Sequence, residues 1–329
     1  MAQSPHDAIF KAVFSELDNA TGVLRRMLPP FVEGTVDWAS LQVEPGSFVD
    51  RRLGHRHSDL LFSVQAGPSR LLLYVLLEHQ STADPWMALR LLRYMVRVWT
   101  RGPRTGALPL IVPLVLSHVE GGWHVDPWFS ALLDPDAVGM VPEAVPEFRF
   151  RVLDLAATSN ADLRGSTLTD EAILTLWLLR DIRDAVAFST NLATWTDVFS
   201  RLERHPAGRE KITRLLTYVL WAGEDLQLDE IHAILEDAAP IAGEILMTTI
   251  AERLIAEGKA RGLAEGKARG LAEGLAEGKV ESLLTVLEAR GLRPTVEQRA
   301  RIEACSDVEL LDQWTLEAVT ALSVDDVLG

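Results

Sequence analysis

Asp59, Glu78 and Gln80 are the residues whose types and spacing could do chemistry in this chain of 329 residues. Two carboxylates that face each other on paired strands repel, because paired Cβ atoms lie only about 4.5–5.5 Å apart. A bound divalent cation removes that repulsion and makes the pair a binding site. Gln80 is two residues from Glu78 and therefore points to the same face of its strand. The three side chains are expected to converge; the alternative is that they are solvated residues at strand ends.

The expected convergence depends on a β-hairpin. Residues 58–65 and 71–80 are rich in apolar side chains and are separated by a turn-forming Ala-Gly-Pro-Ser segment, which predicts two antiparallel strands. With the turn centred on its Pro-Ser step, residues whose numbers add up to 137 face each other, so Asp59 lies opposite Glu78. The pairing depends on this one turn, and a slip of one residue would move the side chains to the other face.

The elements around the hairpin predict a small α/β domain. A helical pattern over 6–28 and a helix that begins at Asp84-Pro85 flank the two strands, and the apolar run 108–118 predicts a further strand. This order indicates a mixed sheet flanked by helices that ends near residue 155. Beyond that point the pattern is helical throughout, with the clearest segments at 169–190, 194–204, 208–222 and 227–238.

A glycine recurs at every fourth position of residues 256–279, among alanine, glutamate, lysine, arginine and leucine, which all favour helix. Each glycine inside a helix costs roughly 0.5–1 kcal/mol relative to alanine, so the repeat needs an explanation. Along a helix these glycines form a slowly winding groove that lets another helix approach closely. The sequence therefore predicts a long helix that either forms a homo-oligomer through residues 256–279 or serves as a solvated spacer.

Four arginines share one face of the helix that follows the hairpin. Arg90, Arg93, Arg97 and Arg101 fall within an arc of about 80°, because each residue turns a helix by 100°. No acidic residue between them offers an i,i+4 ion pair, which favours contacts with phosphate over an ordinary solvated face.

The net charge of −15 is distributed unevenly. Residues 1–120 hold 12 Lys and Arg against 11 Asp and Glu, a net of +1, which leaves 20 against 36, a net of −16, for residues 121–329. The acidity of the whole chain argues against broad electrostatic coating of nucleic acid. It does not exclude a local site on the nearly neutral N-terminal part.

Composition excludes several other classes of protein. The single cysteine, Cys305, cannot form an internal disulfide or a cysteine-based zinc cage, which fits a reducing cytoplasm. No apolar run approaches the roughly 20 residues of a membrane span, and no secretory signal is visible. Phosphate-binding loops, dinucleotide fingerprints and nucleophile elbows are also missing from the sequence. We therefore expect a cytoplasmic protein without a membrane partner.

Several motifs in the N-terminal part resemble, in the same order, those of the YhgA-like transposases, also called the recombination-promoting nuclease (Rpn) family. The motifs are HDAIFK at 6–11, PGSFVD at 45–50, SDLLF at 58–62, LLEHQS at 76–81 and LLRYMVRVW at 91–99. The glycine repeat, which is typical of that family, extends the resemblance more weakly. The resemblance implies a nuclease core of the PD-(D/E)XK type, with a four-stranded mixed sheet between helices, and magnesium-dependent cleavage of DNA.

The resemblance also implies roles for individual residues. Asp59 matches the motif aspartate and Glu78 the acidic residue of the E-x-Q element, whereas Gln80 stands where the wider superfamily has lysine. Asp59, Glu78 and the backbone carbonyl of His79 are then the ligands of Mg²⁺ or Mn²⁺, and Gln80 orients the attacking water. Because glutamine carries no positive charge, activation of that water depends more heavily on the metal.

The first predicted helix offers additional residues for this site. Either Asp7 or Glu16 is expected to complete the acidic set, and Lys11 is expected to contact phosphate; ordinary surface charges are the alternative.

We therefore expect a nuclease-like domain at 1–155, a helical domain at 156–250, a glycine-repeat helix at 251–280 and a helical C-terminal segment at 281–329. The expected function is that of a metal-dependent DNA endonuclease linked to recombination, mobile elements or phage defence. The alternative is a DNA-binding or oligomerising scaffold that keeps the nuclease fold but cleaves weakly or not at all.

Overall fold

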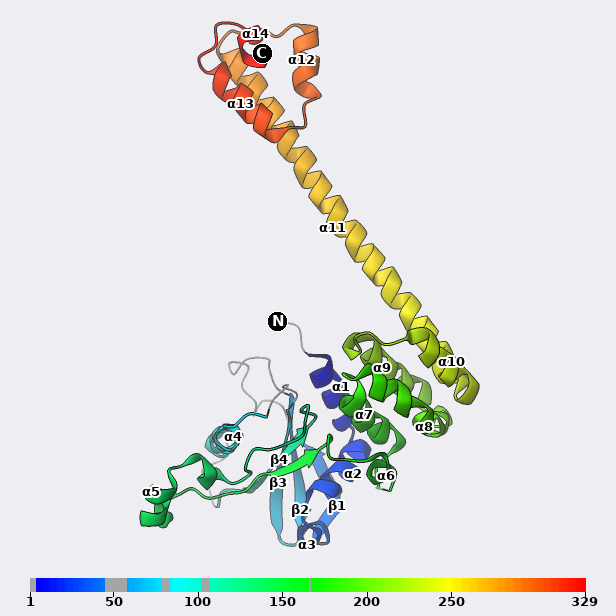
Figure 1. Ribbon diagram of the computed structural model, residues 1–329. Coiled ribbons are helices and arrows are strands. Elements are labelled where there is room, and N and C mark those ends of the chain that lie inside the picture. Colours follow the sequence, from blue (N-terminus) through cyan, green and yellow to red (C-terminus); the bar gives the residue numbers. More distant parts are fainter. Residues whose placement is uncertain (1–3, 45–57, 79–82, 102–106, 166) are drawn as a thin grey trace. The chain divides into compact units, whose positions relative to one another are not determined.

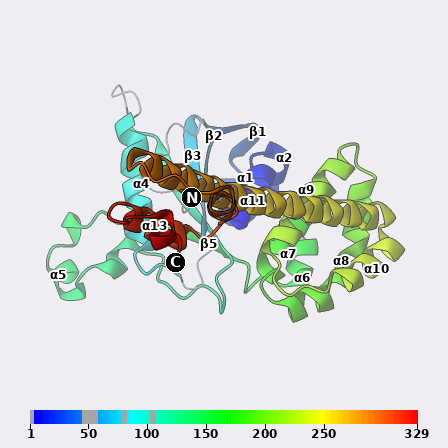
Figure 2. The ribbon, with the colours of Figure 1, turned by 90° about the horizontal axis from the view of Figure 1, so that it is seen from above.

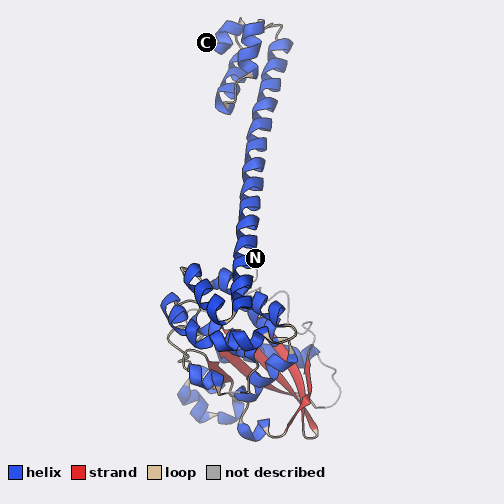
Figure 3. Cartoon of the chain, turned by 90° about the vertical axis from the view of Figure 1, so that its right-hand side faces the viewer, coloured by secondary structure: helices blue, strands red, loops and turns tan. Residues whose placement is uncertain are grey.

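The structure, a computed structural model, consists of two compact units, residues 1–250 and residues 251–329. The predicted domain boundary near residue 155 lies inside the first unit. All described strands belong to the first unit, and the second unit is helical (Figure 3). The residues that the structure describes are 4–44, 58–78, 83–101, 107–165 and 167–329.

A five-stranded mixed sheet forms the centre of the first unit (Figure 1). β1, β2 and β3 pair antiparallel, whereas β3, β4 and β5 pair parallel. Helix α4 makes the crossover that the parallel pairing of β3 and β4 requires. The predicted mixed sheet between helices is confirmed, with one strand more than the resemblance implies. The strands, in spatial order, are β1 (Val36–Val43), β2 (Ser58–Ala66), β3 (Ser69–Glu78), β4 (Leu110–Ser117) and β5 (Arg151–Asp154).

The hairpin between β2 and β3 turns one residue earlier than predicted, at Gly67-Pro68. Gly67 has φ +56°, the left-handed conformation that a two-residue hairpin turn needs at its first central position and that glycine adopts without strain. Paired residue numbers therefore add up to 135, and Asp59 pairs with Leu76. The prediction that Asp59 lies directly opposite Glu78 is wrong.

The helical pattern predicted over 6–28 divides into two helices, because the backbone of Glu16 is extended (φ −78°, ψ 121°). The helices of the first unit are α1 (Pro5–Phe14), α2 (Leu17–Met27), α3 (Pro30–Glu33), α4 (Met87–Arg101), α5 (Pro135–Met140), α6 (Asn160–Arg164), α7 (Asp170–Asp181), α8 (Ala185–Glu203), α9 (Gly208–Ala222) and α10 (Leu228–Ala238), with 3₁₀ turns η2 (Phe129–Leu132) and η3 (Pro142–Ala144).

Side chains that alternate along the strands pack into two cores, one on each face of the sheet. Leu60, Phe62 and Val64 of β2 belong to the larger core, which also holds side chains of α1, α2, α7, α8 and α9. Leu61 belongs to the smaller core, which is formed with α4. Figure 2 shows α4 on one side of the strands and α7–α9 on the other. Because both faces are covered, the central strands are almost continuously apolar.

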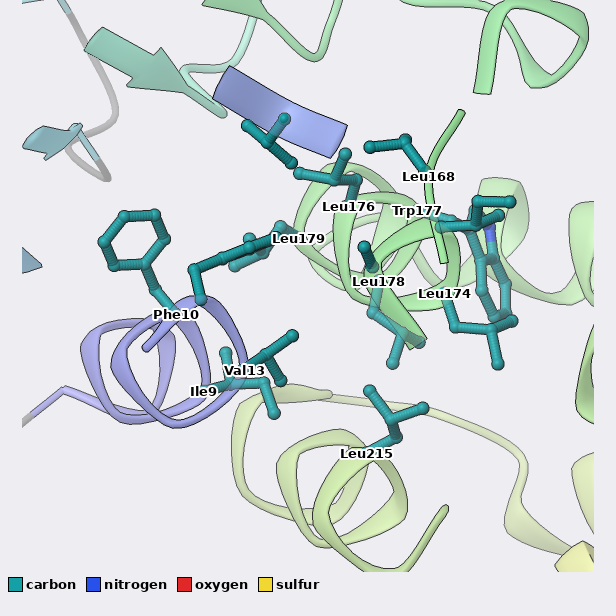
Figure 4. Close-up of a cluster of buried hydrophobic side chains, with 14 of the residues drawn as sticks. Ile9, Phe10, Val13, Leu168, Leu174, Leu176, Trp177, Leu178, Leu179 and Leu215 are labelled. Atoms are coloured by element: carbon teal, nitrogen blue, oxygen red, sulfur yellow. The ribbon is translucent and has the colours of Figure 1, made fainter. Parts of the chain in front are cut away.

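The larger core joins segments that are far apart in the sequence. Val13 of α1, Leu178 of α7 and Leu215 of α9 point toward one another in Figure 4, and Phe10 of α1 belongs to the same core. The same core continues as far along the chain as Leu246. The sheet and the helices after it therefore share one core.

Two arginines hold Asp197 of α8 in the first unit. Its carboxylate accepts hydrogen bonds from Arg164 of α6 (2.7 and 3.0 Å) and from Arg201 (2.7 Å). The bond from Arg164, supported by Arg201, lowers the pKa of Asp197 from 3.8 to about 2.

This lowered pKa gives a stabilisation that is complete above pH ~4 and disappears as the pH falls through ~2. We expect the thermal midpoint of Asp197→Asn to lie below that of the wild type by a constant amount above pH ~4.5, and the gap to close between pH ~4 and ~2. Calorimetry across this range checks the prediction. A gap that stays constant down to pH ~2 would contradict it.

The second unit consists of most of α11 (Pro240–Ala289) and of α12 (Val296–Glu303), α13 (Val308–Ala318) and α14 (Val324–Leu328). Leu283, Leu287 and Trp314 are among the side chains of its small core. The predicted long glycine-repeat helix is confirmed as part of α11. No helix among the described residues has the length and apolar character that crossing a membrane requires.

Residues 251–275 of α11, which contain most of the repeat, have no packing partner within the described chain. Residues 251–275 are all exposed, and a Cβ atom added at any of the six repeat glycines would meet nothing within 4 Å. Six glycines cost about 3–6 kcal/mol of helix stability relative to alanine. The pairs Arg253–Glu257 (2.7 Å) and Arg269–Glu273 (3.6 Å) each return only about 0.3–0.5 kcal/mol. Ion pairs along this helix are therefore too weak to offset its glycines.

Candidate active site

Asp59 is the second residue of β2 and is only 7% exposed. The next residue, Leu60, packs into the larger core, whereas Leu61 packs against α4. Because side chains alternate along a strand, Asp59 lies on the face that α4 covers. A carboxylate this deeply buried needs polar partners or a cation, so Asp59 is not a solvated residue at a strand end.

Glu78 is the last residue of β3, and its backbone register places it at the same edge of the sheet as Asp59. It follows Leu76, the partner of Asp59, by two residues, and it has the parity of Leu72, which packs against α4. On its other side it pairs with the buried Ser117 of β4. Diagonal positions of this kind lie about 7–8 Å apart, a spacing that two carboxylates can bridge through one cation.

The other two predicted ligands, the backbone carbonyl of His79 and the side chain of Glu78, lie outside the described set. Gln80, predicted to orient the attacking water, lies outside it as well. Among the described side chains, no three of His, Cys, Asp or Glu form a group that could hold a metal ion. Asp59 is therefore the only predicted ligand whose side chain is described, and the complete ligand set stays a prediction. Its carboxylate oxygens are of the type that Mg²⁺ and Mn²⁺ prefer.

Helix α4 packs on the sheet face that carries Asp59, and eight residues link Glu78 to Met87. Arg93 is exposed and Arg97 is half-buried. Arg90 differs, since it forms an ion pair with Asp84 (3.2 Å) and its side chain is only 16% exposed. Asp84 thus supplies the acidic partner that the spacing within the helix did not show. Arg90, the first arginine of the face predicted for phosphate contacts, is therefore neutralised by an ion pair. The side chain of Arg101 is outside the described set.

Asp7 belongs to α1, which packs into the larger core, on the opposite face of the sheet from α4. The side chain of Asp7 is 2% exposed, and that of Lys11 is half-buried. The carboxylate of Asp7 is therefore buried, which is compatible with a functional role. Its helix, however, packs on the other face of the sheet. Neither residue is brought to the α4 face by its helix, and their roles stay predictions.

Glu16, which lies between α1 and α2, is part of an ion-pair network with residues of α7 and α9. Its carboxylate contacts Lys211 (2.8 Å) and Arg214 (2.7 Å), and both cations also contact Glu171. Although partial burial raises the pKa of Glu16, hydrogen bonds from Lys211 and Arg214 lower it below its ordinary value overall. These ion pairs give Glu16 a structural role, which is to hold the helices together. It leaves Asp7 as the more suitable of the two acidic candidates.

A cluster of ring side chains at the end of β4 was not found from the sequence. His6 of α1 packs edge-on against His118 with ring centroids 4.9 Å apart, and its Nδ1 lies 2.7 Å from the hydroxyl of Tyr218 in α9. Burial raises the pKa of Tyr218, so this phenol keeps its proton. Nothing in the local sequence could reveal the cluster, because its members are at least 100 residues apart.

Comparison with known proteins adds to this geometry. Residues 4–210 match the family model described as "Putative transposase, YhgA-like", which is more than half of the chain. The chain belongs to this family. The matched region contains the sheet, Asp59, Glu78, α4 and most of the helices that complete the larger core. The resemblance stated from the N-terminal motifs is thereby confirmed.

Curated relatives within this family are named as nucleases. The chain is 30% identical to recombination-promoting nuclease RpnD of Escherichia coli O157:H7 over 257 residues, 76% of this chain and 94% of the relative. It is 26% identical to recombination-promoting nuclease RpnA of E. coli K12 over 78% of this chain and 86% of that protein. It is 29% identical to the inactive nuclease-like protein RpnE of E. coli K12, covering 79% and 84%. No solved structure matches significantly.

Proposed function

We propose that the chain is a metal-dependent DNA endonuclease of the PD-(D/E)XK type that acts in recombination, in mobile-element movement or in phage defence. The observation that carries this proposal is the buried Asp59 at the start of β2, diagonal in register to Glu78 at the end of β3. Membership of a family whose relatives are named recombination-promoting nucleases supports it. The substrate in this proposal is DNA.

Each residue at this edge of the sheet has a separate role in the proposed reaction. Asp59 and Glu78 hold Mg²⁺ or Mn²⁺, with the backbone carbonyl of His79 as a further ligand, and Gln80 orients the attacking water. When bound, the metal supplies an acidified water and stabilises negative charge on the scissile phosphate. Burial of Asp59 excludes bulk water from its carboxylate and so strengthens its attraction for a cation.

The second candidate function is a DNA-binding or oligomerising scaffold that cleaves weakly or not at all. The observation in its favour is that a relative of comparable identity is named inactive. Gln80 in place of the superfamily's lysine is compatible with it, because an amide cannot supply positive charge near the attacked phosphate.

Nicking of supercoiled plasmid in Mg²⁺, in Mn²⁺ and in EDTA tests the first function against the second. Cleavage that depends on either metal and stops in EDTA supports the nuclease. Binding of DNA without cleavage in any condition supports the scaffold. Cleavage that persists in EDTA would contradict metal dependence.

Arg93 is expected to contact the phosphate backbone, because it is exposed on α4, the helix that covers the sheet face of Asp59. Arg93→Ala should weaken DNA binding for all sequences alike and lower the slope of log affinity against log salt by about 0.9, the value for one lost phosphate contact. Fluorescence anisotropy over a salt series measures both. Arg204→Ala, which removes the exposed arginine that directly follows α8, is the control. Equal slopes for the two variants would contradict the role of Arg93.

A further inference from the structure

Helix α4 carries apolar side chains on its exposed face as well as on its buried one. Trp86, which directly precedes the helix, is 59% exposed, and Leu89 and Val96 are 39% and 46% exposed. Arg93 lies among them, because positions 86, 89, 93 and 96 follow one another at the steps of three and four residues that share one helix face. We call these four residues the outer face of α4. Its tryptophan and its arginine lie two turns apart, about 10 Å along the helix axis.

Two backbone hydrogen bonds fix the position of Trp86. Its N–H donates to the carboxylate of Asp84 (2.9 Å), and its carbonyl accepts from the N–H of Arg90 (3.0 Å). Asp84 is itself held by its ion pair with Arg90, and the next residue, Met87, is fully buried in the smaller core. The exposed indole therefore projects from a fixed backbone, which makes it a preformed platform for another flat ring.

The part of the chain that carries this face is basic. Residues 85–119 contain five arginines and no Asp, Glu or Lys, although the whole chain has 47 acidic residues against 32 basic ones. Asp84, which neutralises Arg90, is the last acidic residue before Glu120. The charge of the segment is therefore complementary to a polyanion. Among polyanions, a nucleic acid strand also offers flat rings that can stack on Trp86.

The ring of Trp86 is suited to unpaired bases and not to a duplex. In a duplex the bases stack on one another and present only their edges in the grooves. A single strand exposes the faces of its bases, and each base that stacks on an aromatic side chain raises the affinity about five- to 100-fold. Arginine contacts with the phosphates of the same strand add to this binding without regard to sequence.

We propose that the outer face of α4 binds an unpaired stretch of DNA. Trp86 stacks on one base, Arg93 contacts a phosphate of the same strand, and Leu89 and Val96 pack against its sugar rings. The substrate class is then DNA that carries unpaired bases, such as a single strand, a bubble or a displaced strand. This inference rests on the proposed function, because it takes DNA as the ligand of the chain.

Fluorescence anisotropy of the full chain with three labelled DNAs of equal length tests the inference, in EDTA so that metal-dependent cleavage does not occur. The DNAs are a mixed-sequence single strand, its duplex, and an abasic single strand that keeps the phosphates but has no bases. Trp86→Ala should bind the mixed single strand at least about fivefold more weakly than the wild type, the lower end of the contribution of one stacked base. It should bind the duplex and the abasic strand with wild-type affinity. Trp86→Phe keeps an aromatic ring and should recover most of the loss.

The control is Trp221→Ala, which removes another exposed tryptophan (68%) from α9 and should bind all three DNAs like the wild type. A wild type that binds none of the DNAs would contradict the proposed function and the inference with it. A wild type that binds the duplex but not the mixed strand would overturn the inference alone. So would an equal loss on all three DNAs for Trp86→Ala. Unchanged binding of the mixed strand by Trp86→Ala would also overturn it, and would leave the outer face of α4 to a protein partner.

Discussion

Asp59→Asn should lower metal-dependent nicking of plasmid DNA at least about 100-fold, because changes in groups that only support metal ligands already cost about 10–100-fold. Asparagine has the shape of aspartate, so the packing around this 7% exposed side chain is kept. What is lost is the negative charge that attracts the cation. The initial nicking rate in saturating Mg²⁺, measured with enzyme in excess, gives the effect on the cleavage step.

Asp18→Asn is the matched control, because Asp18 is an exposed aspartate on α2 in the same unit. It should nick DNA at the wild-type rate. Thermal midpoints separate lost chemistry from lost folding, and both variants should melt within a few degrees of the wild type. Equal nicking rates for Asp59→Asn and Asp18→Asn would show that Asp59 is not part of the active site. Any cleavage would then come from other residues.

Glu171→Gln should destabilise the first unit by about 3 kcal/mol, near the lower end of the cost of breaking a buried ion pair. Glu171 is 1% exposed and accepts hydrogen bonds from Asn19 (2.9 Å), Lys211 and Arg214 (3.1 Å). Glutamine removes the charge and leaves both cations to Glu16 alone. Because Glu16 remains, the loss does not reach the upper end of that range. The expected fall in thermal midpoint is about 6–12 °C for a unit of this size.

Glu210→Gln provides the comparison for this network. Glu210 also pairs with Arg214, but at 3.6 Å and with 78% of its side chain exposed. Its removal should change the midpoint by no more than 1–2 °C, since exposed i,i+4 pairs contribute about 0.3–0.5 kcal/mol. Calorimetry of the two variants side by side checks the difference. Similar midpoints for both would show that burial does not decide the strength of this network.

The hairpin shows how far sequence can define the candidate site. The apolar runs and the turn residues predict β2 and β3, and therefore the edge at which Asp59 and Glu78 lie. The register was missed because a centre at Pro68-Ser69 ignores the positive φ that Gly67 supplies. An error of one residue in the turn converts a direct pair into a diagonal one. Asp59 and Glu78 still lie on the same face of the sheet, because the sum of paired residue numbers changes by two and side chains alternate with a period of two.

Contacts between distant segments account for the other differences. The helical pattern over 6–28 gives no sign of a break at Glu16, whose partners Lys211 and Arg214 come almost 200 residues later. Arg90 appeared free of acidic partners because its partner, Asp84, lies before the helix and outside i,i+4 spacing. Local sequence patterns indicate secondary-structure propensity and burial. The fold decides which charges from distant parts of the chain form ion pairs.

The shared core has a consequence for synthesis on the ribosome. The sheet is complete in sequence at Asp154, but the core that covers one of its faces draws side chains from as late as Leu246. At about 5–20 residues per second, roughly 5–20 s pass between the emergence of these two residues. During that interval the nascent chain presents an uncovered apolar sheet face to the cell. A chaperone that binds extended apolar segments is therefore expected to act on this chain before translation ends.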